Sequence, residues 1–218
     1  MPLFPLPIVQ FPLATTSLHI FEPRYRRMLE DVQAGEAIFG IVLRQADGLA
    51  SVGCTVRLLH VNSLPDGRSN IECLGQSRFR LIEVIEDDEA PYARAVIEAF
   101  DDDPGFEDDE TSELFERLKE LFGRLYSANR RLRGLADSDT DPELPDLPAD
   151  EELFSYVLAD NLAVDLALKQ RWLELTSTPL RLREMESHLV EAAEAEERKV
   201  WVGKVSRTNG HGGKLPHG

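Results

Sequence analysis

The residues best suited to recognition chemistry lie together in the segment His19-Ile20-Phe21-Glu22-Pro23-Arg24-Tyr25-Arg26. A structural interpretation explains most of them, because the segment reads as the end of a strand that enters a helix. Glu22 would then lie near the positive helix N-terminus, Phe21 and Tyr25 in the core, and Arg24 in an ion pair. The alternative is a recognition patch for a partner. We favour the structural role, since capping and core packing account for most of these side chains.

A second candidate is the pair Arg78 and Arg80, which alternate with Phe79. In a strand this spacing places both arginines on one face and Phe79 on the other, so we expect the arginines on the outer face. They would be solvated there or paired with acidic side chains. The functional alternative is a small anion or carboxylate site, because arginine binds such groups through two parallel hydrogen bonds.

Catalytic and cofactor motifs are missing from the sequence. It contains no GxxxxGK[ST], no GxGxxG after a strand, no HExxH and no GxSxG pattern. The histidines His19, His60 and His188 have no nucleophile beside them in the sequence, and His60 is expected to be a half-buried strand residue. An enzyme would need His19 or His60 to meet a carboxylate or a thiol in a cleft of the folded chain. We therefore predict a protein without catalytic activity and without a cofactor.

A metal site is not predicted either. Asp137, Asp139 and Asp141 are spaced like the start of a calcium loop. However, Pro142 stands where that loop needs glycine, and Pro148 where it needs a bidentate glutamate. The acidic residues are better explained as a solvated loop.

The segment from residue 52 to residue 81 predicts a β-hairpin. Asp66-Gly67 is typical of a two-residue turn, and such a turn places Pro65 opposite Arg68. In this register the apolar residues of both strands fall on one side of the hairpin, so turn and pattern agree.

The same register separates the two cysteines. Cys73 would face His60 and Cys54 would face Phe79, which leaves the two sulfurs roughly 20 Å apart at about 3.3 Å per strand residue. A disulfide needs Cα atoms within about 7 Å of each other. We predict two buried, reduced thiols, and no CxxC spacing suggests a metal site.

The composition argues against nucleic-acid and membrane partners. The 218 residues carry 40 acidic and 24 basic side chains, a formal net charge of −16. Phosphate groups and anionic membrane surfaces are bound through Lys and Arg. Four prolines interrupt the apolar first 21 residues and no basic segment precedes them, so neither a membrane span nor a secretory signal is predicted. We expect a cytoplasmic protein that begins directly in its fold.

Charge and periodicity change along the chain. Residues 1–82 are nearly neutral, whereas residues 83–198 hold 33 acidic and 12 basic side chains. The most acidic stretch, 101–110, reads DDDPGFEDDE and predicts a solvated connector. Before it, apolar runs at 38–43 and 92–100 predict strands, and one helix is predicted from Pro23 to Gly35.

After the connector, apolar residues recur with the period of an α-helix. A stripe from Leu114 to Leu132 predicts a long helix that ends at Gly134. Residues 135–149 are rich in Pro and Asp and predict a loop.

Three further helix starts follow. Asp150 and Asp165 are expected to cap two helices, and Thr178-Pro179 has the cap and first-turn residues of a last one. From Ser206 the chain is Gly-rich and is expected to be disordered.

Short motifs follow one another in a specific order along the chain. They are Leu3-Phe4-Pro5-Leu6, Phe11-Pro12, Leu18 to Tyr25, Phe39-Gly40-Ile41-Val42, Val52-Gly53, Leu64 to Arg68, Gly75 with Arg78-Phe79-Arg80, Pro91-Tyr92, Ser155-Tyr156, Lys169-Gln170 and Thr178-Pro179-Leu180. This series resembles the N-terminal, substrate-binding domain family of Lon proteases over about residues 1–199.

The resemblance implies an α+β fold, in which a β-rich PUA-like pseudo-barrel with one inserted helix is followed by a C-terminal helical bundle. We place the pseudo-barrel subdomain at 1–103, the helical bundle at 104–205 and a disordered tail at 206–218. The ATPase and Ser-Lys peptidase modules of full-length Lon proteases do not follow in this sequence, so the chain is similar to the stand-alone members of the family.

The resemblance also implies a non-catalytic module that binds peptides or proteins, either unfolded or degron-bearing polypeptides or a dedicated partner. We expect it to be an adaptor or regulator in protein quality control that captures apolar segments in a groove between barrel and helices. The candidate peptide-binding residues are His19, Phe21, Glu22, Arg24, Tyr25, Arg78 and Arg80. The alternative is an RNA-binding PUA-like protein, which would need its arginines on one face beside an exposed aromatic side chain.

Overall fold

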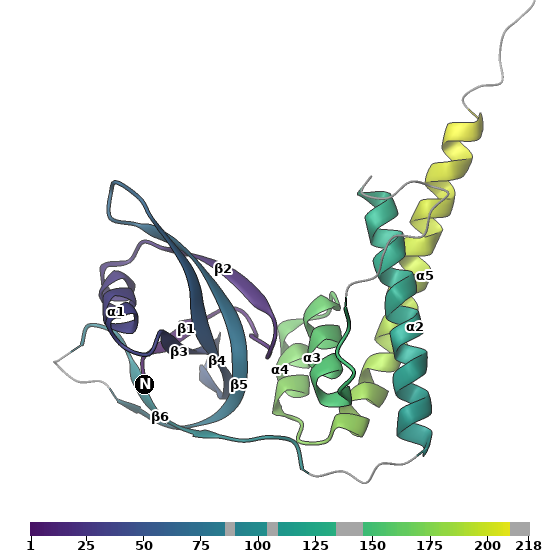
Figure 1. The fold of residues 1–218 in the computed structure, drawn as a ribbon. Helices are drawn as coiled ribbons and strands as arrows, with labels where there is room; N and C mark the ends of the chain where they lie inside the picture. The colour runs from purple at the N-terminus through teal and green to yellow at the C-terminus, as the bar shows by residue number, and fades with distance from the viewer. Residues whose placement is uncertain (86–89, 104–108, 134–145, 210–218) are drawn as a thin grey trace, which may run out of the picture. The chain divides into compact units, whose positions relative to one another are not determined.

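The computed structural model describes residues 1–85, 90–103, 109–133 and 146–209, without the side chains of Asp109 and residues 202–209. The chain forms two compact units, one of residues 1–105 and 148–181 and the other of residues 106–147 and 182–218. The first unit therefore extends beyond the predicted subdomain 1–103 and includes two helices from the second half of the chain (Figure 1). The division at residue 103 stays a prediction.

The first unit is built on a sheet of six strands. They are β1 (Leu3–Leu6), β2 (Thr15–Ile20), β3 (Ile38–Gln45), β4 (Gly48–Ser63), β5 (Ser69–Ile85) and β6 (Arg94–Ala99). Their order is β1-β3-β4-β5-β2, and β6 pairs with the far half of β5. The sheet curls until Pro2 forms a bridge with Arg94 of β6, and the Leu3 amide donates to the Ala93 carbonyl, just before β6, at 2.9 Å. This is the predicted α+β fold with a curled sheet, in which β1 and β3 run parallel and the other pairs antiparallel.

One helix, α1 (Pro23–Ala34), is inserted between β2 and β3, as predicted. Pro23 suits its first turn because a first-turn residue needs no hydrogen-bonded amide. The side chains that recur at helical spacing, Tyr25, Met28, Leu29 and Val32, are all buried. They join Phe4, Phe39, Ile41 and Val56 of the sheet in one apolar core.

The β4–β5 hairpin exists, but the predicted two-residue turn is wrong. The Leu64 amide donates to the Arg68 carbonyl at 2.8 Å, and the Gly67 amide donates to the Leu64 carbonyl at 3.0 Å. The loop therefore has three residues, Pro65 to Gly67, with Gly67 at a φ of +81°. Proline is favoured at the first central position of such a turn, and glycine adopts the left-handed conformation that follows it without strain.

The longer loop shifts every pairing in the hairpin by one residue, and two bulges shift it again. Cys73 lies opposite Leu58, not His60, and Cys54 lies opposite Arg78, not Phe79. Both cysteines are buried and free, as predicted. His60 is exposed rather than half-buried, with its side chain 79% accessible.

Two short helices complete the first unit. Helices α3 (Glu151–Asn161) and α4 (Leu166–Glu174) begin at the predicted caps, because the Asp150 and Asp165 carboxylates accept hydrogen bonds from the backbone amides of Leu153 and Leu168. Helix α4 packs on the sheet, where the Gln170 amide donates to the Val52 carbonyl at 3.0 Å.

The last helix, α5 (Thr178–Asn209), starts one residue earlier than predicted. Ser177, not Thr178, acts as its cap, since its hydroxyl accepts from the Leu180 amide and its carbonyl from the Arg181 amide. Residues 206–209, predicted to begin the disordered tail, are helical. The rest of the tail lies outside the described residues.

The second unit contains α2 (Asp109–Leu132) and most of α5. The predicted stripe of α2 is buried at Leu114, Leu118, Leu125 and Ala128, whereas Leu132 is 42% exposed. Ion pairs join the two helices between Arg117 and Glu186 at 2.8 Å and between Arg124 and Glu197 at 2.9 Å. Gly134, most of the predicted 135–149 loop with its three aspartates, and part of the acidic connector lie outside the described residues.

Candidate functional site

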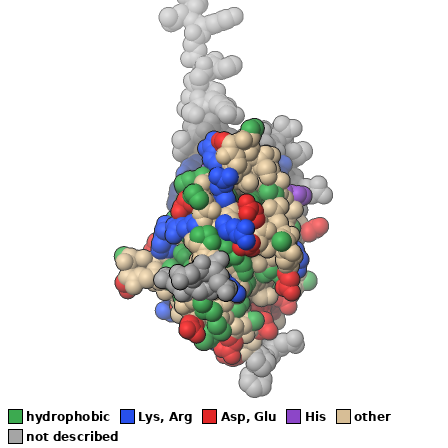
Figure 2. All heavy atoms as spheres, turned by 90° about the vertical axis from the view of Figure 1, so that its left-hand side faces the viewer, with side chains coloured by type: hydrophobic (Ala, Val, Ile, Leu, Met, Phe, Trp, Pro, Cys, Tyr) green, Lys and Arg blue, Asp and Glu red, His purple; other side chains and the backbone are tan. Residues whose placement is uncertain are grey.

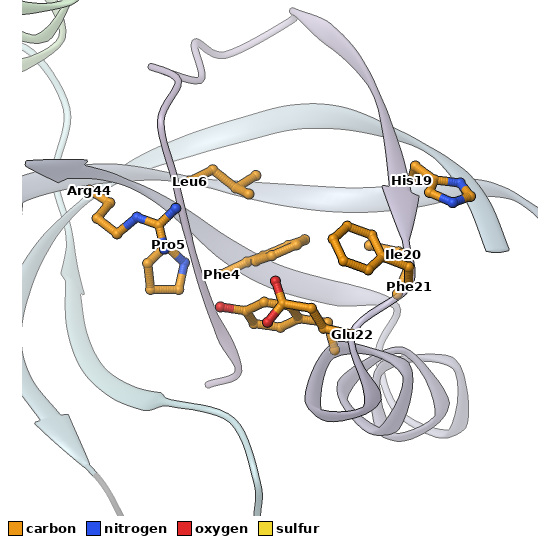
Figure 3. A pocket seen from close by; sticks show the side chains of 9 residues that line it. Phe4, Pro5, Leu6, His19, Ile20, Phe21, Glu22 and Arg44 are labelled. Atoms are coloured by element: carbon orange, nitrogen blue, oxygen red, sulfur yellow. The ribbon is translucent and has the colours of Figure 1, made fainter. Parts of the chain in front are cut away.

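A small pocket of about 90 Å³ lies where β1, the end of β2, the start of α1 and the end of β3 meet. Figure 3 shows its lining side chains, with the Phe4 ring in the middle and Arg44 and His19 at opposite ends. The lining residues are Phe4, Pro5, Leu6, His19, Ile20, Phe21, Glu22, Tyr25 and Arg44. Four of the predicted site residues, His19, Phe21, Glu22 and Tyr25, are therefore brought together here.

Phe21 is a largely exposed aromatic side chain of this pocket. It is 59% accessible, so the expectation that it packs in the core is wrong. Its ring is stacked on that of His19, with 6.0 Å between centroids and 23° between planes. The His19 Nδ1 atom lies 2.7 Å from the Asn70 Oδ1 atom, which fixes the imidazole ring. The result is an apolar ring held open to solvent at the mouth of the pocket.

Tyr25 forms part of the pocket floor and is only 6% exposed. Its ring packs against Phe4 with 4.2 Å between centroids, and the Arg24 guanidinium lies 4.5 Å from its centre. Burial raises the pKa of the Tyr25 hydroxyl, the positive charges of Arg24 and Arg44 oppose this, and Glu22 adds to it. Glu22 and Arg24 form an exposed ion pair at 2.8 Å, so the predicted ion pair of Arg24 is present.

A larger pocket of about 470 Å³ adjoins the small one and shares Pro5, Tyr25 and Arg44 with it. Its other lining residues are Arg24, Leu49, Val84, Ala90, Pro91, Tyr92 and Ala93. The face that carries α1 and the hairpin tip shows basic, acidic and apolar side chains close together (Figure 2). Sequence reasoning missed Arg44, because a polar residue at the end of an apolar strand carries no signal of its own.

The two remaining candidates, Arg78 and Arg80, lie elsewhere. Arg78 is buried, with only 1% of its side chain accessible, and its guanidinium bonds to Asp102 and to the carbonyl oxygens of Leu173 and Leu175. Arg80 lies with its guanidinium 4.0 Å from the centre of the Phe100 ring. The outer face of β5 at Arg78 is covered by the helices of the first unit, which a local strand pattern cannot reveal.

Arg78 belongs to a set of side chains that we call the buried arginine cluster, namely Arg78, Asp102, Tyr156, Thr178 and Arg181. The Arg181 Nη2 atom lies 2.6 Å from the Asp102 Oδ2 atom, and its guanidinium lies 4.5 Å from the centre of the Tyr156 ring. Burial alone would raise the pKa of Asp102, but its hydrogen bond with Arg181, the Thr178 hydroxyl and the charges of Arg181 and Arg78 lower it overall. The cluster joins β5 to the start of α5 within the first unit.

The described residues contain no group of three or more His, Cys, Asp or Glu side chains placed to hold a metal ion. His19 contacts an amide oxygen rather than a carboxylate or thiol. Burial raises the pKa of each thiol, Cys54 and Cys73, to about 12, so both are protonated at neutral pH. In the described part of the chain, no helix is long and apolar enough to cross a membrane.

Three of the arginines that an RNA site would need are paired with acidic side chains or buried. Arg24 and Arg27 pair with the acidic side chains of Glu22, Glu30 and Asp31, and Arg78 is buried. This distribution argues against nucleic-acid binding, which needs accessible cations along one surface.

Solved structures share this fold. The Lon N-terminal domain protein from Xanthomonas campestris aligns with a TM-score of 0.63 at 22% identity, covering 86% of this chain and 96% of that one. The N-terminal domain of the Mycobacterium avium complex Lon protease aligns with the same TM-score at 18% identity, covering 88% of this chain and 97% of that one.

Sequence comparison identifies the family. Residues 1–191 match the family described as the ATP-dependent protease La (LON) substrate-binding domain, and the chain belongs to this family. The Lon protease of Syntrophus aciditrophicus is 26% identical over 192 residues, which are 81% of this chain and 24% of that protein. The Lon protease of Flavobacterium johnsoniae is 28% identical over 131 residues, or 56% of this chain and 16% of that protein. The chain thus spans about a quarter or less of these relatives and matches only their substrate-binding domain.

Proposed function

We propose that this protein binds exposed apolar segments of polypeptides through the two adjoining pockets, without catalysing a reaction. The observation that carries the proposal is Phe21, a large aromatic side chain held 59% exposed at the mouth of an apolar pocket. Large aromatic side chains beside a desolvated pocket dominate the energy of protein recognition. Membership of a substrate-binding domain family supports this.

The pockets are suited to an extended chain rather than to a folded surface. The small pocket of about 90 Å³ accepts a single side chain, and the larger one of about 470 Å³ accepts several residues of a peptide. The Glu22–Arg24 pair supplies a charged rim that tunes selectivity while apolar contact supplies affinity. The groove expected between barrel and helices stays a prediction; the two pockets described above lie at β1, α1 and β3.

We further propose that the protein is an adaptor or regulator in protein quality control, presenting captured polypeptides to other components. The support is the family to which the chain belongs, since the relatives that share this domain are named Lon protease. RNA binding is the weaker alternative, because Arg24 and Arg27 pair with acidic side chains and Arg78 is buried.

The proposal is tested by fluorescence anisotropy with a labelled, permanently unfolded polypeptide, its folded counterpart and a single-stranded RNA. We expect saturable binding to the unfolded chain alone, with weak dependence on salt. Phe21→Ala should weaken this binding about tenfold, as loss of a recognition hot spot does.

The matched control is Ile82→Ala, because Ile82 is 58% exposed and lines neither pocket. It should bind as the unchanged protein does. Equal losses for Phe21→Ala and Ile82→Ala would argue for non-specific adhesion. Binding to RNA with a steep salt dependence would favour the nucleic-acid alternative instead.

A further inference from the structure

Arg44, at the end of β3, lies between two apolar surfaces because it lines both pockets. It is exposed, and it forms no ion pair with any residue that the structure describes. The other charges of the two pockets, Glu22 and Arg24, neutralise each other at 2.8 Å. Among the lining residues that the structure describes, Arg44 therefore contributes one positive charge without an ion-pair partner, located where the two pockets join.

Tyr25 adds a hydrogen-bond donor at the same junction. Its side chain is more than nine-tenths buried, it lines both pockets, and its hydroxyl has no hydrogen-bond partner among the described residues. The charge of Arg44 is close enough to act on this hydroxyl. The hydroxyl oxygen is not among the buried side-chain atoms that lack a partner, so it reaches solvent and can donate to an acceptor beside the Arg44 guanidinium.

Apolar side chains flank this junction on both sides. Phe4, Leu6 and Phe21 lie on the side of the small pocket, and Leu49, Val84 and Pro91 on the side of the larger one. Figure 3 shows Arg44 beside Pro5, with Leu6, Phe4 and Phe21 extending away from it. A peptide that fills both pockets must therefore pass the Arg44 guanidinium, with one apolar contact before it and another after it.

We propose that the preferred ligand is an extended peptide in which an acidic side chain lies between two bulky apolar ones, its carboxylate accepting from Arg44 and from the Tyr25 hydroxyl. This inference rests on the proposed function and specifies its substrate class. Arginine can bind a carboxylate through two parallel hydrogen bonds, and the Tyr25 hydroxyl supplies a third. The selectivity is unexpected from composition, because the whole chain carries a net charge of −16.

The test uses labelled nine-residue peptides, amidated at the C-terminus, that place Leu-Glu-Leu, Leu-Gln-Leu or Leu-Lys-Leu in a Gly-Ser background. We expect Leu-Glu-Leu to bind about fivefold more tightly than Leu-Gln-Leu, and Leu-Lys-Leu to bind most weakly, as partly exposed charge-assisted hydrogen bonds predict. Arg44→Gln should abolish the preference for Glu, and Tyr25→Phe should reduce it. Arg57→Gln, at an exposed arginine of β4 outside both pockets, should leave it unchanged.

A further peptide carries Leu at its end with a free C-terminal carboxylate and no acidic side chain. Tighter binding of this peptide than of Leu-Glu-Leu would overturn the inference in favour of chain-end recognition. Equal binding of the Glu and Gln peptides, with the Phe21→Ala loss still present, would overturn the inference and leave the proposed function standing. Absence of binding to every peptide and to the unfolded polypeptide would overturn both.

Discussion

The buried arginine cluster and the pair of pockets are built from similar residues but differ in their access to water. In both regions an arginine lies over a tyrosine ring, at 4.5 Å for Arg181 on Tyr156 and for Arg24 on Tyr25. The Arg181 side chain is fully buried, whereas that of Arg24 is 47% exposed. The arginine–tyrosine contact therefore stabilises the fold at Arg181, because charge interactions strengthen as water is excluded. At Arg24 the same contact is weaker, and the side chain can still change its position.

The two regions also differ in the candidate binding residues Arg78 and Arg24, whose sequence surroundings are similar. Arg78 and Arg24 each adjoin an aromatic residue in the chain. Arg78 bonds to two backbone carbonyl oxygens and a carboxylate, so a ligand would have to displace these contacts. Arg24 faces solvent with one exposed partner. We therefore propose that the pockets serve recognition and that the cluster serves stability.

The largest effect is expected from Asp102→Ala, which leaves two buried guanidinium groups without their carboxylate. We expect a loss of about 3–5 kcal/mol in the free energy of unfolding, as for breaking other buried ion pairs. Urea denaturation measures it. Asp103→Ala is the control, since Asp103 is exposed and accepts a single hydrogen bond from the Thr176 hydroxyl; its loss should be about 1 kcal/mol. Similar losses for both variants would show that the buried ion pairs of Asp102 do not carry the effect.

Arg78→Lys should lower the free energy of unfolding by less, about 2 kcal/mol. The charge is kept, while the hydrogen bonds of the planar guanidinium to three partners are lost. The same change at the pockets, Arg24→Lys, should leave the free energy of unfolding nearly unchanged, since an exposed ion pair contributes at most about 1 kcal/mol. Parallel thermal and urea unfolding of the two variants checks the contrast. A loss in Arg24→Lys as large as that in Arg78→Lys would contradict it.

The cluster also predicts a dependence of stability on acid. The folded-state pKa of Asp102 is lowered, so its ionised form stabilises the fold above its unfolded pKa of about 3.9, and this contribution is lost as the pH falls through the lower folded value. Urea unfolding between pH 7 and pH 3 measures the loss. In Asp102→Asn the decline below pH 4 should be shallower than in the unchanged protein. An identical decline would show that other carboxylates carry the effect.

The smallest effect on stability is expected at the pockets. Glu22→Gln removes a pair whose side chains are 47% and 39% exposed, so the free energy of unfolding should change by less than about 0.5 kcal/mol. The substitution frees Arg24 and should strengthen binding of the Leu-Glu-Leu peptide, which anisotropy measures. Weaker binding of that peptide would show that Glu22 itself contacts the ligand.

Local patterns predicted the elements well where the physical cause is local. Helix α1 begins at Pro23 and buries the four predicted side chains, and Asp150 and Asp165 cap the helices expected of them. A cap acts within three residues and an amphipathic stripe within one helix, so neither depends on the rest of the chain.

The hairpin shows where local reasoning reaches its limit. Asp66-Gly67 is compatible with a two-residue turn, but Pro65 favours the three-residue loop that is observed, and the difference shifts the pairing of both cysteines. The candidate site was found only in part for a similar reason. The His19–Tyr25 segment carries a dense signal, whereas Arg44 reaches the pocket because β1 and β3 pair in parallel.

The sequence by itself determined the starts of helices α1, α3 and α4, the burial of both thiols and the resemblance to the Lon substrate-binding domain, since each depends on short-range order or on motif sequence. Only the tertiary structure decided which aromatic and arginine side chains are exposed to solvent. Phe21 was expected inside and is exposed, while Arg78 was expected outside and is buried beneath residues about 95 positions away. Exposure depends on what packs over a residue, and that contact is made by distant parts of the chain.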